Sequence, residues 1–141
     1  MFDRVLVDPP CSGLGTLQAR ADLRWRVTPE QLPEMVRAQT AILKAGAAAL
    51  RPGGVLVYST CTISPTENER LIAAFLDSHP DFSLDDLAAE LPAQRLGLSR
   101  SVTDLRAGAP TRQVASSSGL VLTLPHRDRT AGFFIARLRR S

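Results

Sequence analysis

Two short predicted strands, each followed by a polar segment with a cysteine, constrain the fold of this chain most. Residues 2–7 (FDRVLV) and 55–59 (VLVYS) have the length and apolar character of buried strands. Between them, a helical pattern starts at the capping box Thr28–Gln31 and extends to residue 50. A strand, a crossover helix and a second buried strand predict an α/β fold, in which helices cover both faces of a parallel sheet.

Prolines and glycines mark the ends of the predicted elements. Pro29 and Pro33 both suit the first turn of a helix, so the first helix begins at one or the other. Residues 51–54 (RPGG) predict its end and a turn into the second strand. A second capping box, Ser64–Glu67, predicts another helix that ends at about Ser78. Residues 67–69 (ENE) are interpreted as the start of this helix and as a candidate support of the pocket.

The last third of the chain divides into a long loop and a hairpin. Residues 92–118 are rich in Ser, Arg, Gly and Ala, which predicts a surface loop that is flexible or ordered only by a partner. Residues 120–124 and 132–138 predict two strands joined by a short linker. We expect these strands to form an antiparallel hairpin that closes one edge of the sheet.

Composition excludes several classes of protein. With 141 residues, 44% of them hydrophobic, the chain can form one domain with a core, and it has no apolar stretch of membrane-spanning length. It shows no secretory signal and has too few cysteines for a disulfide scaffold, so we expect a cytoplasmic protein. The net charge of +3 is compatible with an RNA partner without requiring one.

The two cysteines occupy equivalent places, directly after the two predicted strands. Cys11 belongs to the segment DPPCSG at residues 8–13, and Cys61 belongs to STCT at residues 59–62. Because neighbouring parallel strands lie about 4.8 Å apart, both thiols are expected to face one pocket at the carboxyl edge of the sheet. A thiolate at such a polar strand end is a strong nucleophile.

The cysteines also allow other interpretations. A single cysteine would be explained most simply as a buried, inert thiol, but two at equivalent strand ends favour chemistry. His79 and His126 have no ligand spacing to either cysteine, so no metal site is expected. The sequence has no C-x-x-C motif and no P-loop, and Gly13-Leu14-Gly15 does not continue into a dinucleotide fingerprint.

Several segments together resemble one known family. They are DPPCSG, ADLRW at 21–25, the helix around 39–43, RPGGVLVYSTC at 51–61, ISPTENE at 63–69 and GFFIARL at 132–138. In this order they resemble the C-terminal part of the Sun/Fmu-type (RsmB-like) RNA cytosine-C5 methyltransferases. Residues 129–132 (RTAG) depart from the family, whose members usually carry a Gly-Thr-Asp-Gly-like turn there, so we assign no role to an acid in this turn.

The resemblance implies a covalent mechanism. Cys61 of the TC motif would attack C6 of cytosine, so that C5 can accept a methyl group from S-adenosylmethionine. Cys11 of the PPC motif would help to remove the C5 proton and release the enzyme by β-elimination. Asp8 would lie near both the base and the cofactor, and Pro9 and Pro10 would keep the substrate loop rigid. The base must be unstacked, so single-stranded or locally opened RNA is the expected substrate. The resemblance implies that this RNA is 16S ribosomal RNA.

The resemblance also implies that residues 1–141 form part of a catalytic domain, the C-terminal half of a Rossmann-like class I methyltransferase sheet. In the family, a Gly-rich loop and an acidic residue on earlier strands bind S-adenosylmethionine, and this sequence has neither. A full-length form is expected to be a monomer that binds no metal or membrane. Two alternatives stay open: a non-catalytic RNA-binding or assembly module derived from such an enzyme, and a structural α/β domain with incidental cysteines.

Overall fold

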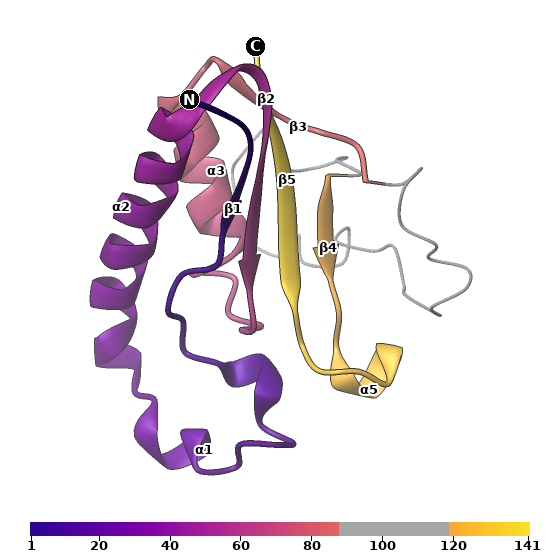
Figure 1. The fold of residues 1–141 in the computed structure, drawn as a ribbon. Helices are drawn as coiled ribbons and strands as arrows, with labels where there is room; N and C mark the ends of the chain where they lie inside the picture. The colour runs from indigo at the N-terminus through magenta and orange to yellow at the C-terminus, as the bar shows by residue number, and fades with distance from the viewer. Residues whose placement is uncertain (88–118) are drawn as a thin grey trace.

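The computed structural model describes residues 1–87 and 119–141, so the loop predicted at 92–118 lies outside the described residues. In chain order, the elements in Figure 1 are β1 (Phe2–Val7), the 3₁₀ helix η1 (Leu14–Thr16), α1 (Leu23–Arg26), the 3₁₀ helix η2 (Pro29–Gln31), α2 (Leu32–Ala49), β2 (Leu50–Thr60), α3 (Glu69–Ser78), β3 (Phe82–Leu84), β4 (Leu120–Leu122), α5 (Pro125–Asp128) and β5 (Phe134–Arg140). No helix in this part of the chain is long and apolar enough to cross a membrane.

The strands form one mixed sheet. β1 and β2 are parallel, with Val7 opposite Tyr58, which confirms the predicted strand–helix–strand unit. The predicted burial of residues 2–7 is wrong, because β1 is an edge strand and only Val7 of it is buried. β5 lies on the other side of β2 and runs antiparallel to it, with Ala136 opposite Tyr58. β4 and β3 both pair with β5, at successive positions along it, and together form the far edge of the sheet. The predicted antiparallel hairpin is therefore confirmed, whereas β3 was not predicted.

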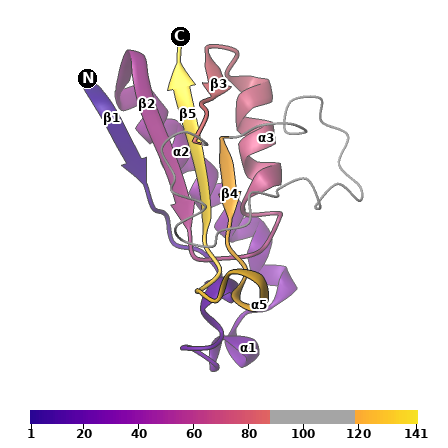
Figure 2. The same ribbon diagram turned by 90° about the vertical axis from the view of Figure 1, so that its right-hand side faces the viewer.

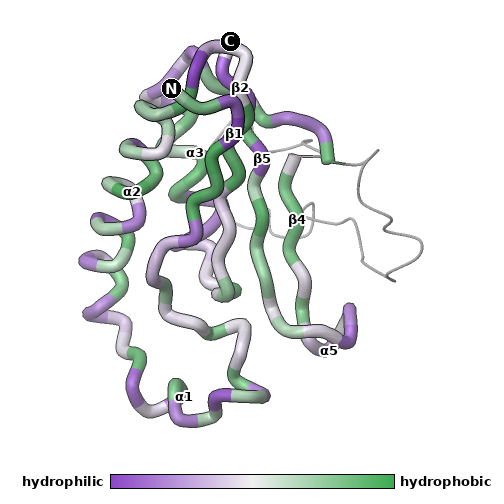
Figure 3. The backbone as a smooth tube through the Cα atoms, viewed as in Figure 1, coloured by the Kyte–Doolittle hydropathy of each residue, from purple (hydrophilic) through white to green (hydrophobic). Residues whose placement is uncertain are grey.

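The two long helices, α2 and α3, lie on the same face of the sheet (Figures 1 and 2). In Figure 3, α2 alternates between hydrophobic and hydrophilic residues along its length, as expected for a helix with one face on a sheet. Leu43 of α2 and Ile72 of α3 have no exposed surface and pack in one core with Leu56 of β2 and Leu138 of β5. This layer supplies most of the apolar burial that stabilises the fold.

The other face of the sheet differs from the prediction. Among the described residues, no helix covers it (Figure 2), whereas the sequence predicted helices on both faces. Leu6 points to this face and is 70% exposed, while its neighbour Val7 is buried beneath α2. Along β2, buried residues likewise alternate with half-buried ones, which is the pattern of a sheet covered on one side.

Two element boundaries also differ from those predicted. β2 begins at Leu50 and not at Val55, because Leu50 already pairs with Phe2 before an irregularity in the register. Gly53 has a φ of +75° and makes the predicted turn within this first part of the strand. The regular helix α2 begins at Leu32. The capping box predicted at Thr28 forms, but it caps the start of the short η2 helix that precedes α2.

Candidate active site at the carboxyl ends of β1 and β2

The two cysteines face each other where β1 and β2 end. Their Sγ atoms lie 3.4 Å apart, within hydrogen-bonding distance for two thiols, although 50 residues separate them in the sequence. Both thiols are free and only partly buried. The predicted proximity of the two thiols is confirmed, since the register that puts Val7 beside Tyr58 lets both loops leave the sheet at the same level.

The surroundings of Cys11 strongly change the acidity of its thiol. Burial, and after it the hydrogen bond with Cys61, raise the pKa of the Cys11 thiol to about 12. Cys11 is therefore protonated at neutral pH. In that state it can donate its S–H to Cys61 and stabilise a negative charge on the Cys61 sulfur.

A buried carboxylate links the two cysteine-bearing loops. The side chain of Glu67 has no exposed surface. Its Oε1 accepts hydrogen bonds from the backbone N–H of Ser12 (2.8 Å) and from Nε2 of Gln39 (3.0 Å). Its Oε2 accepts from the hydroxyls of Ser12 (2.6 Å) and Thr62 (3.0 Å). Because Ser12 follows Cys11 and Thr62 follows Cys61, one side chain holds the residues next to both thiols.

Because Glu67 binds the cysteine loops, helix α3 begins later than the sequence predicted. The expected capping box Ser64–Glu67 does not form, and α3 begins only at Glu69. The Glu67 carboxylate binds residues of the other loop, and the backbone N–H of Ser64 donates to the Thr62 hydroxyl (3.2 Å). An S-x-x-E spacing is the same for a cap and for this network, so the sequence alone could not distinguish them. The predicted capping role of Glu67 is therefore wrong, whereas the predicted support of the pocket agrees with its bonds to Ser12 and Thr62.

Buried polar side chains also fix the backbone around Cys61. The Thr60 hydroxyl donates to Oδ1 of Asn68 (2.6 Å), whose Nδ2 donates to the carbonyl of Thr62 (2.8 Å). The Tyr58 hydroxyl donates to the carbonyl of Glu67 (2.9 Å), and burial followed by the charge of Glu67 raises the pKa of Tyr58. Tyr58 is therefore a neutral donor that links the strand to the start of α3.

Close backbone contacts complete the same end of the sheet. The Gly15 N–H donates to the carbonyl of Cys61 (2.9 Å), and the Gly132 N–H donates to the carbonyl of Gly15 (2.7 Å). A Cβ at position 15 would overlap the Gly132 carbonyl, and one at position 132 would lie 2.5 Å from Cγ2 of Ile63. Glycine is needed at both positions for this close approach, a requirement that no pattern in the sequence indicated.

The remaining predicted site residues surround the Cys11 loop. Pro9 is buried, and Pro10 is exposed but has its carbonyl held by Nε2 of Gln39 (3.0 Å). Asp8 is exposed directly after β1 and forms no hydrogen bond or ion pair with another described residue. Its free carboxylate fits a positively charged or N–H-bearing ligand. The described residues contain no group of three or more His, Cys, Asp or Glu arranged for a metal ion.

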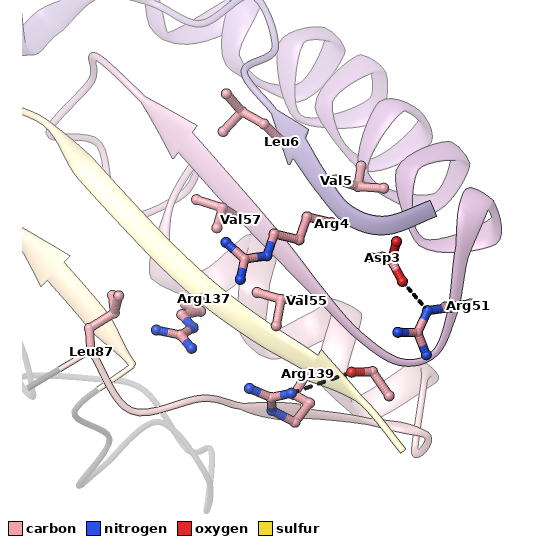
Figure 4. A pocket seen from close by; sticks show the side chains of 11 residues that line it. Asp3, Arg4, Val5, Leu6, Arg51, Val55, Val57, Leu87, Arg137 and Arg139 are labelled. Carbon is pink, nitrogen blue, oxygen red and sulfur yellow. Dashed lines mark hydrogen bonds and ion pairs between the residues drawn. The ribbon is translucent and has the colours of Figure 1, made fainter. Parts of the chain in front are cut away.

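A hollow of about 740 Å³ lies at the other end of the strands, away from the thiols. It opens on the helix-free face, between the start of β1 and the end of β5 (Figure 4). Arg51 pairs there with Asp3, and Nη2 of Arg139 lies 2.9 Å from Oδ2 of Asp85. The cysteine chemistry is therefore not located in this hollow.

Comparison with known proteins identifies the family. The family described as 16S rRNA methyltransferase RsmB/F matches residues 1–139 of this chain. This chain belongs to that family. The resemblance seen in the DPPCSG and STC motifs is thereby confirmed, and so is the α/β methyltransferase fold.

Two curated members of the family align with nearly the whole chain. It is 42% identical over 141 residues to the probable ribosomal RNA small subunit methyltransferase B of Synechocystis sp.. It is 36% identical over 140 residues to the probable ribosomal RNA small subunit methyltransferase B of Bacillus subtilis. The alignments cover 100% and 99% of this chain but only 28% of each relative, so the chain spans less than a third of their length.

Solved structures of the family show the same fold. A methyltransferase homolog protein from Pyrococcus horikoshii has a TM-score of 0.76 and 31% identity, over 99% of this chain and 39% of the other. The structure of NSun6 from Pyrococcus horikoshii with SFG has a TM-score of 0.69 and 31% identity, over 96% of this chain and 29% of the other. The fold of this chain is thus shared with both proteins.

Proposed function

We propose that this chain supplies the cysteine-bearing part of an S-adenosylmethionine-dependent ribosomal RNA cytosine-C5 methyltransferase. Membership of the RsmB/F family supports ribosomal RNA methylation. The observation that supports C5 of cytosine is the pair of thiols 3.4 Å apart at the ends of two parallel strands. C5 of cytosine accepts a methyl group only after a nucleophile has added to C6, and two thiols allow one to attack while the other handles protons.

In this proposal Cys61 is the nucleophile. Its thiolate, stabilised by the S–H of Cys11, forms a bond to C6, and the electron pair of the C5–C6 double bond becomes available at C5. S-adenosylmethionine, when bound, supplies the methyl group that C5 accepts. Loss of the C5 proton and departure of the Cys61 sulfur from C6 then restore the ring. The base gains one methyl group and loses one proton, and Cys61 returns as a thiolate.

We assign the proton handling to Cys11. The raised pKa of its thiol suits a group that keeps its proton while Cys61 attacks. Its sulfur lies 3.4 Å from that of Cys61, and therefore close to the ring carbons once the Cys61–C6 bond has formed. Once the charge of Cys61 is consumed in the Cys61–C6 bond, Cys11 would give its own proton to water. As a thiolate it would then accept the C5 proton, while the Cys61 sulfur leaves C6 as a thiolate and frees the enzyme.

The cofactor is expected to be held only in part by this chain. A family member solved with SFG, an analogue of S-adenosylmethionine, supports the cofactor class. Asp8 is the cofactor contact that we predict here, and its exposed carboxylate fits the positive charge of that molecule. We propose that a preceding part of a longer protein supplies the rest, next to the exposed edge strand β1, where Phe2 is 64% exposed. Residues 1–141 alone should bind S-adenosylmethionine no tighter than about 10 µM by isothermal titration.

An exposed tryptophan supports RNA as the substrate. Trp25 of α1 is 83% exposed, and the exposed Arg24 and Arg26 flank it. Leu23 of the same short helix is buried against Gly13, so α1 is anchored to the Cys11 loop. Exposed aromatic rings next to arginine are typical of proteins that stack unpaired RNA bases. Since Trp25 is the only tryptophan, quenching of its fluorescence by single-stranded RNA would report this contact directly.

The function is tested with a chimera in which this chain replaces the matching region of the Synechocystis relative. The chimera should methylate C5 of a cytosine in 16S ribosomal RNA. It should also form a covalent complex with RNA that contains 5-fluorocytosine, because fluorine at C5 blocks the elimination. Cys61→Ala should abolish both activities.

Methylation by the Cys61→Ala chimera, or methylation at a different atom, would contradict the proposal. An inactive chimera combined with RNA binding by residues 1–141 would favour the second candidate, a non-catalytic RNA-binding module.

A further inference from the structure

We propose that Glu67 is a positioning residue that holds the two thiols at their working distance. Glu67 touches neither sulfur. It binds Ser12 through both the backbone and the hydroxyl, and it binds the hydroxyl of Thr62, so it fixes the residues that follow Cys11 and Cys61. The inference rests on the proposed function only for the activity measurement given below.

The arrangement depends on a carboxylate and not only on the shape of the side chain. The hydroxyls of Ser12 and Thr62 lie 2.7 Å apart, and both lie within 3.0 Å of Oε2 of Glu67. These three oxygens share two hydroxyl protons, and the carboxylate accepts without adding a proton of its own. A glutamine placed with its amide nitrogen there would donate to both hydroxyls, and one hydroxyl proton would lose its acceptor. With the amide reversed, its nitrogen would face two other N–H donors, those of Ser12 and Gln39.

A third element fixes the carboxylate itself. Nε2 of Gln39, on α2, donates to Oε1 of Glu67 and to the carbonyl of Pro10, the residue before Cys11. Both Gln39 and Glu67 have no exposed surface, so water does not compete for these bonds. The Glu67 side chain thus connects both cysteine loops to Gln39 of the packed helix α2. A loss of about 1 Å in such positioning can slow a reaction about 10²-fold.

The chain offers a matched control two residues further on. Glu69 is also buried at the start of α3, but both of its carboxylate oxygens lack a hydrogen-bond partner among the described residues. Glu69→Gln therefore changes a buried carboxyl group of the same segment without touching the cysteine loops.

The first experiment uses residues 1–141 and needs neither RNA nor cofactor. Diamide takes up the two thiol hydrogens and joins Cys11 to Cys61 as a disulfide, at a rate that depends on how closely the sulfurs are held. Glu67→Gln should slow this closure about tenfold or more, measured by mass spectrometry, whereas Glu69→Gln should leave it unchanged. The alkylation rate of Cys61 in a Cys11→Ala background corrects for intrinsic reactivity.

A folded Glu67→Gln protein that closes the disulfide as fast as the original chain would overturn the inference. If Glu67→Gln does not fold, Ser12→Ala and Thr62→Val each remove one contact of the carboxylate. Slower closure in both supports the positioning role, and unchanged closure in either overturns it.

The second experiment measures methylation by the chimera. Glu67→Gln should lower kcat about 10²-fold and leave KM for RNA within about twofold, because the thiols and not the RNA contacts are displaced. A rise in KM at constant kcat would overturn the positioning role. If the unmodified chimera is inactive, the proposed function fails, whereas the disulfide experiment still decides the role of Glu67.

Discussion

The two ends of the β1–β2 pair use polar side chains in opposite ways. At the carboxyl end, Glu67 and Asn68 are fully buried, and hydrogen bonds of 2.6–3.0 Å join them to the cysteine loops. At the amino end, Arg51 and Asp3 form an ion pair whose side chains are 53% and 74% exposed, beside an arginine-lined hollow. A buried polar group that loses a hydrogen-bond partner is destabilised because no water replaces it, so the buried network fixes one geometry. An exposed ion that loses its partner is hydrated by water, so the exposed pair fixes little.

Two glycines show the same difference. Gly15, at the thiol end, has no space for a Cβ because the carbonyl of Gly132 lies against it. Gly53, at the amino end, would place its Cβ 3.8 Å from Nη1 of Arg51, an ordinary contact, but it has a φ of +75°. Gly15 is thus limited by packing and Gly53 by local backbone conformation. We expect substitutions to have their largest effects at the thiol end.

The largest effect should come from Cys11→Ala in the chimera. Turnover should fall about 10²–10⁴-fold, because the group that assists proton removal is lost. Attack by Cys61 should still occur, so a covalent protein–RNA species should accumulate in denaturing gels with ordinary cytosine RNA. The control is the Cys11→Ala, Cys61→Ala double variant, which should form no adduct. An adduct in Cys61→Ala and none in Cys11→Ala would reverse the two roles.

Gly15→Ala should destabilise the fold more than Gly53→Ala at the amino end. The new methyl group overlaps the Gly132 carbonyl, so the segment before β5 must move away from the Cys61 loop. We expect a loss of about 3 kcal/mol in the free energy of unfolding, measured by urea denaturation. A loss below about 1 kcal/mol would mean that the close approach of these two loops is not rigid.

Gly53→Ala is the matched substitution at the amino end. Its cost comes only from placing an L-residue at a left-handed φ, since no atom blocks the methyl group. We expect about 1 kcal/mol of destabilisation in the same urea experiment. An effect as large as that of Gly15→Ala would remove the difference between the two ends.

Glu69→Gln should reveal a pH dependence at the thiol end. Burial raises the pKa of Glu69 above its ordinary value of 4.5, so the folded protein keeps this proton to higher pH than the unfolded chain. Stability therefore falls as the pH rises from 4.5 through the folded pKa. Glu69→Gln should raise Tm at pH 7 and change it little at pH 4. Equal or lower stability of the variant at pH 7 would contradict this.

Arg51→Ala, in the exposed pair at the amino end, should have the smallest effect. Its guanidinium lowers the pKa of Asp3, so the substitution should return that pKa toward its ordinary value in an NMR titration. The free energy of unfolding should not change measurably, because water replaces an exposed partner at little cost. A clear loss of stability would show that this end is more rigid than we infer.

Much of this architecture was predictable because it depends on local patterns. The apolar runs that end at Val7 and Ser59 predicted two strands, and the helical spacing through Leu43 predicted a crossover helix between them. The predicted burial of the first strand is wrong, because β1 lies at the edge of the sheet and only Val7 of it is buried. Parallel pairing of the two strands then placed Cys11 and Cys61 together without knowledge of any side-chain contact. By contrast, β3 has only three residues, too few for a periodic pattern, and its pairing with β5 joins segments far apart in the sequence.

The sequence by itself therefore determined the order of the long strands and helices, the family and the meeting of the two thiols. The tertiary structure alone decided how that meeting is held: Glu67 fits a helix cap by its spacing, yet it binds Ser12, 55 residues away, and Gln39, 28 residues away. It also decided that Gly15 must lie against Gly132. The physical reason is that spacing along a chain defines strands and helices, whereas a buried hydrogen bond is decided by which groups the finished fold encloses together.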